Sequence, residues 1–197
     1  MEKSYFKFFL YITYVLLLFS FYCSINNGLS MDENFHHISG QVRYLYLKNF
    51  GDFDKYKKIY ALDYYPGFND TVNFVFYKII SSIIGEKYLV EIKHFLTYTF
   101  SALSILGMYF VNKKIFNKEI SIISCAITLL NPFFFGNMGI NPKDPVIFFA
   151  FIWSIYFLLL YLDSVNSNRL KNLIYLSFFI GFGTSIRLTF ASILLPI

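Results

Sequence analysis

The stretch "PVIFFAFIWSIYFLLLYL", residues 145–162, decides the fold of this chain, because it runs for eighteen residues without a charged side chain. A helix needs about 20 apolar residues, with a range of about 17–25, to cross the hydrocarbon core of a membrane. Backbone groups in lipid must find their hydrogen bonds inside the segment, which favours a helix. The stretch therefore predicts a membrane-spanning helix.

Four more apolar segments lie outward from this stretch, and together they predict an all-α polytopic membrane protein with about five transmembrane helices. The composition agrees, with 56% hydrophobic and 15% charged residues, whereas soluble domains carry about 25% charge. The Lys and Arg residues are scattered, which is typical of topology signals and predicts no nucleic-acid partner. The expected spans are 5–25, 94–111, 120–135, 145–162 and 173–197 of a single module covering 1–197.

The short loops set the expected orientation. Lys3 and Lys7 precede the first span, which is long and lacks a small-residue cleavage pattern, so an uncleaved anchor is favoured over a signal peptide. Basic loops at 112–119 and 163–172 then lie on the cytoplasmic side with the N-terminus. The loops 26–93 and 136–144 face outside.

The long outer loop 26–93 is not a featureless linker. Apolar residues recur at helical spacing in residues 33–50 and again in 71–84. Two amphipathic helices lying at the membrane surface are expected there.

An acidic and histidine-rich stretch, "SMDENFHHISG" (30–40), directly follows the first span. On a helix, Asp32 would face His36 and Glu33 would face His37. One interpretation is a helix N-terminus, where acidic residues are favoured. A metal site is an alternative, but no third ligand is evident, so no metal ligands are assigned and a divalent cation stays open as a cofactor. The third interpretation is a general base at the membrane surface, supported by His36.

Two further features fall on the same expected outer face. Lys143 and Asp144 lie between prolines in "NPKDP", either as a neutral ion pair in a turn or as groups facing a shared site. Arg187 interrupts the fifth span nearer its outer end, where it either extends to the surface or binds an anion such as a phosphate. In "LDYYPGFND" (62–70), Tyr64 and Tyr65 could stack on a sugar or shape a cleft.

In this order, the features resemble the polytopic glycosyltransferases of the GT-C class, specifically the family 39 or dolichyl-phosphate-mannose protein mannosyltransferase-like group. The resemblance rests on "DENFH", on "YYPGF", on "GFGTSIRLTF" and above all on "NPFFFGNMGINPKDP". Members of this group are usually longer, so the chain is expected to be an N-terminal part, truncated at its C-terminus.

The resemblance implies inverting sugar transfer from a polyprenyl-phosphate donor in the membrane to a hydroxyl of a protein, lipid or glycan. It implies a bacterial inner-membrane location with the site facing the periplasm. Asp32 would be the base, with Glu33 and Asp144 as further catalytic carboxylates. His36, Lys143, Arg187, Tyr64 and Tyr65 would contact substrate. The rival hypotheses are a transporter or lipid-binding protein that uses the same charges, and an inactive fragment of the longer enzyme.

Overall fold

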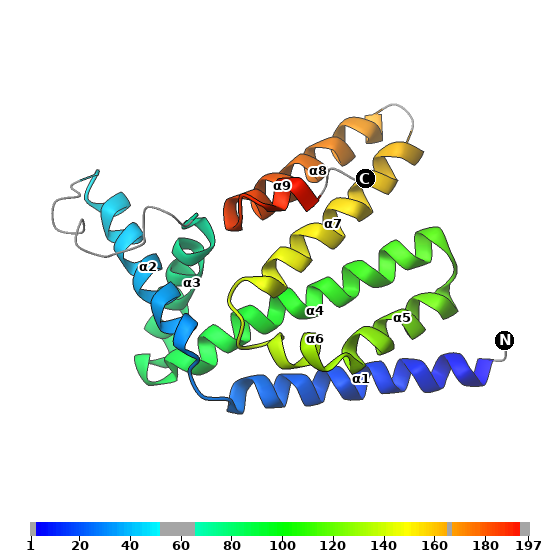
Figure 1. Cartoon of the computed structure of the whole chain (residues 1–197), viewed down its shortest axis with the longest axis horizontal. Coiled ribbons are helices and arrows are strands. Elements are labelled where there is room, and N and C mark those ends of the chain that lie inside the picture. Colours follow the sequence, from blue (N-terminus) through cyan, green and yellow to red (C-terminus); the bar gives the residue numbers. More distant parts are fainter. Residues whose placement is uncertain (1–2, 52–65, 165–166, 194–197) are drawn as a thin grey trace.

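The computed structural model describes residues 3–51, 66–164 and 167–193, and these parts of the chain are helical without a strand, as the sequence predicts. Long helices lie side by side along one axis, and α2 and α3 lie across one end of them (Figure 1). The elements are α1 (Lys3–Asn26), α2 (Met31–Lys48), α3 (Phe68–Ile84), the 3-10 turn η2 (Glu86–Tyr88), α4 (Leu89–Ile115), α5 (Lys118–Leu130), α6 (Pro132–Asn137), α7 (Asp144–Asp163), α8 (Ser167–Ile186) and α9 (Phe190–Ile193).

Three helices of the described chain are long and apolar enough to cross a membrane, namely α1, α4 with its preceding turn, and α7. α1 and α7 coincide closely with the expected spans 5–25 and 145–162, whereas α4 begins earlier than the expected span 94–111. Large apolar side chains along α1, such as Phe8 and Leu18, are exposed. A lipid-facing surface accounts for this exposure, because hydrocarbon solvates apolar side chains.

The expected span 120–135 is two helices in the structure, with a break at Asn131. The Asn131 side chain accepts hydrogen bonds from the first backbone N–H groups of α6, and Pro132 occupies the first helical position, where its missing N–H costs nothing. α5 alone has 13 residues. It is therefore about 20 Å long, shorter than the hydrocarbon core of about 30 Å.

The expected span 173–197 is also broken, so Arg187 does not lie inside a continuous helix. α8 ends at Ile186, and the chain turns before the short α9 begins. Gly183 permits this turn, because a Cβ atom there would lie 2.4 Å from the ring of Phe190. Arg187 thus lies in a turn between two helices.

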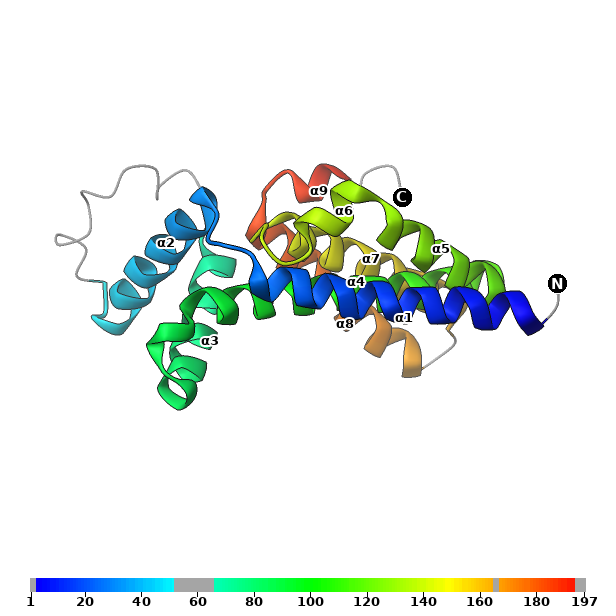
Figure 2. The same ribbon diagram turned by 90° about the horizontal axis from the view of Figure 1, so that it is seen from below.

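Both helices expected in the long loop are present as α2 and α3. They pack against each other and project beyond the long helices at one end (Figure 2). Gly40 lets the two backbones approach, because a Cβ atom there would lie 2.1 Å from the carbonyl oxygen of Asp70. We call this end of the molecule, which also holds the 138–143 loop and the α8–α9 turn, the polar end.

A row of buried polar side chains on α4 joins this helix to its neighbours. His94, Thr97, Ser101 and Ser104 recur at helical spacing and are all buried. The hydroxyl of Ser101 donates a hydrogen bond to the carbonyl oxygen of Met138 at 2.7 Å. Small polar residues at such interfaces allow close helix packing, which brings the 138–143 loop against α4.

Candidate active site

The start of α2 is fixed by a reciprocal capping box. The hydroxyl of Ser30 accepts a hydrogen bond from the backbone N–H of Glu33, and the Glu33 carboxylate accepts one from the N–H of Ser30 at 2.6 Å. Asp32 lies in the same first turn, and its side chain is exposed. The helix N-terminus interpretation thus describes Glu33, whereas the Asp32 carboxylate faces outward.

Glu33 is buried and pairs with a histidine from another helix. Its Oε1 atom lies 2.8 Å from Nε2 of His94, and Nδ1 of His94 lies 2.7 Å from the carbonyl oxygen of Ser24. The sequence suggested His37 as the partner of Glu33, so this pairing is a correction. Each ring nitrogen of His94 thus lies close to an oxygen atom of another helix.

The environment of Glu33 favours its charged form. Burial alone would raise the pKa of its carboxyl group, but the contacts with His94 and the Ser30 backbone outweigh burial and lower the pKa. Glu33 therefore joins the start of α2 to α4, and His94 extends this connection to the end of α1 through Ser24.

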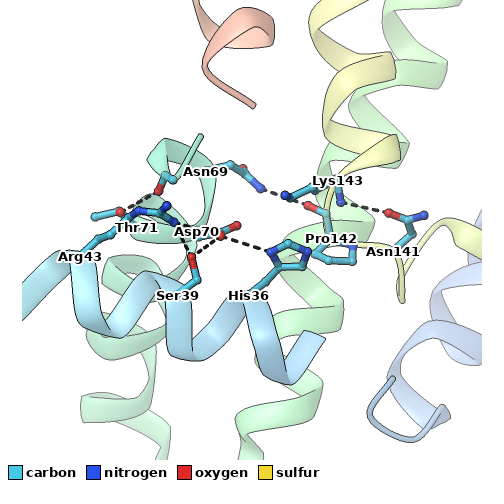
Figure 3. Close-up of polar contacts among 10 residues, drawn as sticks. His36, Ser39, Arg43, Asn69, Asp70, Thr71, Asn141, Pro142 and Lys143 are labelled. Carbon is cyan, nitrogen blue, oxygen red and sulfur yellow. Dashed lines mark hydrogen bonds and ion pairs between the residues drawn. The ribbon is translucent and has the colours of Figure 1, made fainter. Parts of the chain in front are cut away.

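A second buried carboxylate, Asp70 at the start of α3, contacts three side chains of α2 (Figure 3). Its Oδ2 atom accepts a hydrogen bond from the Ser39 hydroxyl at 2.6 Å and lies 3.2 Å from Nδ1 of His36 and 3.6 Å from Nη1 of Arg43. His36 was expected to support Asp32, yet the structure shows it against Asp70. Asp70 therefore fixes the orientation of His36 and Arg43.

The "NPKD" loop is tied both to α7 and to α3. The Asn141 side chain accepts hydrogen bonds from the N–H groups of Lys143 and Asp144, each at 3.0 Å, and donates one to the Asp144 carboxylate at 2.9 Å. From α3, the Asn69 amide donates to the carbonyl oxygen of Pro142 at 3.0 Å (Figure 3). These bonds hold the loop between the start of α7 and the α2–α3 pair.

Lys143 is the buried cation on which the surrounding charges converge. Burial is the main cause that lowers the pKa of its ammonium group; Asp70 and Asp32 act to raise the pKa, and Arg187 and Arg43 act to lower it. These charges come from α2, α3 and the α8–α9 turn. With Asp144, the cluster around Lys143 therefore combines three acidic and three basic side chains.

Arg187 and Asp144 form the more exposed edge of this cluster. Nη2 of Arg187 lies 3.2 Å from Oδ1 of Asp144, and the side chains are 52% and 39% exposed. A cavity of about 250 Å³ begins at this pair and continues along apolar residues of α7, including Ile147, Phe148 and Phe151. The cavity thus combines the Arg187–Asp144 ion pair at its edge with an apolar wall that could contact a hydrocarbon chain.

The structure brings three of the expected site residues, Lys143, Asp144 and Arg187, into one cluster. Asp32 acts on Lys143 through its charge, and Glu33 is turned away into the interior. Tyr64 and Tyr65 lie outside the described residues. In the described part of the chain, no three His, Cys, Asp or Glu side chains are grouped to hold a metal ion.

Sequence reasoning missed Arg43, Asp70 and His94 as parts of the site. Asp70 had one usable signal: an acidic residue directly before an expected helix favours the helix start. Arg43 and His94 had none, because their partners lie on other helices.

Comparison with known proteins adds a family match. The model of a family described as dolichyl-phosphate-mannose-protein mannosyltransferase matches residues 72–197. The matched range contains His94, Lys143, Asp144 and Arg187, but begins after Asp32 and Asp70. No curated protein and no solved structure matches the chain.

Proposed function

The chain belongs to the dolichyl-phosphate-mannose-protein mannosyltransferase family of membrane glycosyltransferases, and we propose that it transfers a sugar from a polyprenyl-phosphate donor to an acceptor hydroxyl. The observation that carries this proposal is the Lys143-centred charge cluster. It has an exposed carboxylate on one side and a cation above an apolar cavity on the other. A lipid-phosphate sugar needs both halves of this arrangement.

Asp32 is the group best placed to act as general base. It is exposed at a helix start fixed by the capping box, and its charge acts on Lys143 at the centre of the cluster. In the proposed step the carboxylate takes the proton of the acceptor hydroxyl. The hydroxyl oxygen then bonds to the anomeric carbon, and the bond from that carbon to the phosphate oxygen breaks with inversion.

Arg187 and Lys143 stabilise the negative charge that develops on the departing phosphate. A guanidinium presents a fork of donors that matches phosphate oxygens, and fixed charges that stabilise a transition state are a major catalytic contribution. The apolar wall of α7 would hold the first isoprene units of the donor. Asp144 orients Arg187 through their ion pair, and Asn141 in turn holds Asp144.

Glu33 and His36 take supporting roles in this scheme. Glu33 acts as a positioning residue, because its capping box and its contact with His94 hold the turn that carries Asp32. His36 is held at the polar end by its contact with Asp70. The acceptor is proposed to approach from the periplasmic or luminal side, since the basic loops 112–119 and 163–172 favour the other side as cytoplasmic.

The test is sugar transfer by purified protein from a polyprenyl-phosphate sugar. Asp32→Asn should reduce the turnover about 10²–10⁴-fold, the usual contribution of a general base. Glu86→Gln is a matched control, because Glu86 is an exposed carboxylate outside the cluster. Wild-type turnover by Asp32→Asn would remove Asp32 from this role.

A further inference from the structure

An apolar groove is lined by residues of α1, α4 and α5. These three helices extend away from the polar end (Figure 1). Its volume is about 400 Å³, larger than that of the cavity at Arg187. The walls are formed by Phe6, Leu10 and Leu17 of α1, Leu106 and Tyr109 of α4, and Ile122 of α5. The donor and acceptor chemistry proposed above makes no use of this groove.

The groove has the depth of one membrane leaflet. On α1 it extends from Phe6 near the helix start to Leu17. Eleven residues of helix span about 16 Å at 1.5 Å per residue, which is about half of the hydrocarbon core of about 30 Å. An acyl chain that enters from the nearby surface would lie along the groove within its own leaflet.

Two lysines stand over aromatic rings at the shallow end of the groove. Nζ of Lys118 lies 4.6 Å from the ring centroid of Phe6, and Nζ of Lys113 lies 5.9 Å from that of Tyr109. Both side chains are exposed, and both rings line the groove. A cation held over an aromatic ring is attracted to its face, so the groove has a positively charged mouth.

The neighbouring charges leave the mouth basic. Lys114 is paired with Asp163 of α7 at 2.7 Å. Glu119 in the first turn of α5 offsets one of the two charges of Lys113 and Lys118, so one positive charge remains. The N-terminus of α5, which begins at Lys118, adds a partial positive charge.

We propose that this groove binds one acyl chain of an anionic phospholipid, whose phosphate lies at Lys118 and Lys113. The apolar walls match the chain, the depth matches one leaflet, and the lysines match the charge of the headgroup. The site differs from the proposed donor site, which lies at the other end of the molecule. The lipid would stabilise the contacts between α1, α4 and α5.

Native mass spectrometry of the purified full chain, with added phosphatidylglycerol or phosphatidylcholine, tests this proposal. We expect one phosphatidylglycerol to be retained at least tenfold better than phosphatidylcholine. Lys118→Glu should abolish that preference without disturbing α5, because acidic residues are favoured in the first turn of a helix. Lys171→Glu is the matched control, since Lys171 is exposed on α8 outside the groove.

A second variant separates the groove from the surface charge. Leu10→Trp fills the groove and keeps both lysines, so it should lose the bound lipid while circular dichroism shows an unchanged helix content. Retention of phosphatidylglycerol by Leu10→Trp, or equal retention of both lipids by the wild type, would overturn the proposal. So would a lipid-free dimer, because a second copy would then cover the groove.

Discussion

His94 and Glu33 form an ion pair between α4 and α2, with 2.8 Å between Nε2 and Oε1, and both side chains are almost completely buried. The same imidazole reaches the carbonyl oxygen of Ser24 near the end of α1. A single residue of α4 thus holds both ends of the short connection that leads to Asp32.

We predict that His94→Leu lowers the free energy of unfolding by about 3 kcal/mol, because it leaves a buried carboxylate without its partner. The double variant His94→Leu/Glu33→Gln should lose less than the sum of the two single variants, since the uncompensated charge is then gone. Denaturant unfolding in detergent micelles measures both values. Strict additivity of the two changes would contradict this account of the pair.

Arg187→Lys should raise KM for the lipid-phosphate donor about tenfold or more. The ammonium keeps the charge but loses the planar fork that meets both Asp144 and a phosphate. Arg169→Lys makes the same replacement at an exposed arginine that lies over the ring of Tyr161, outside the site. Equal KM values for the two variants would remove Arg187 from the donor site.

Stability should fall on acidification because of His37. Burial, together with the charge of Lys93, lowers the pKa of His37 from 6.5 to about 4. Between these two pH values the unfolded chain binds the extra proton and the folded chain does not, so the folded state loses stability as the pH falls.

The His37→Phe variant should flatten this loss. Phenylalanine keeps a ring against Phe74 and Tyr77, which His37 contacts at centroid distances of 5.3 and 5.0 Å. The midpoint of thermal unfolding, followed from pH 7 to pH 4.5, should decline less steeply in the variant than in the wild type. Parallel slopes would show that His37 does not cause the decline.

Gly40→Ala should destabilise the α2–α3 pair, although alanine is the better helix former by up to about 1 kcal/mol. The added Cβ would lie 2.1 Å from the carbonyl oxygen of Asp70, which is backbone and cannot move aside without shifting α3. Gly181→Ala is the matched control within α8, because nothing lies within 4 Å of its added Cβ. We expect the two changes to shift the thermal midpoint in opposite directions.

Local patterns predicted the elements that depend on local physics. The helices at 33–50 and 71–84 follow from apolar spacing, and α2 and α3 confirm them. The break at Asn131 was missed, although Asn-Pro is a helix-start signal, because the apolar run around it suggested one span.

The pairing of charges was less accessible, because it depends on which helices meet. Helical spacing predicted that Glu33 would pair with His37. In the structure, α4 packs against α1 and places His94 in contact with Glu33 instead. Arg187 was expected inside a span, and only the fold-back of α9 onto Gly183 shows the turn. Asp32, Lys143, Asp144 and Arg187 could be selected from the sequence as polar exceptions near expected span ends, but their partners could not.

The burial of the two anchoring carboxylates has a mechanical consequence. Glu33 and Asp70 are enclosed and bonded on several sides, so the wall that carries Asp32 should resist displacement. Arg187 is half-exposed and lies next to a four-residue helix, and its ion pair with Asp144 links it to α7. We therefore expect the side of the candidate site that carries Asp32 to be more rigid than the side that carries Arg187, so that a wider substrate would displace the α8–α9 turn first.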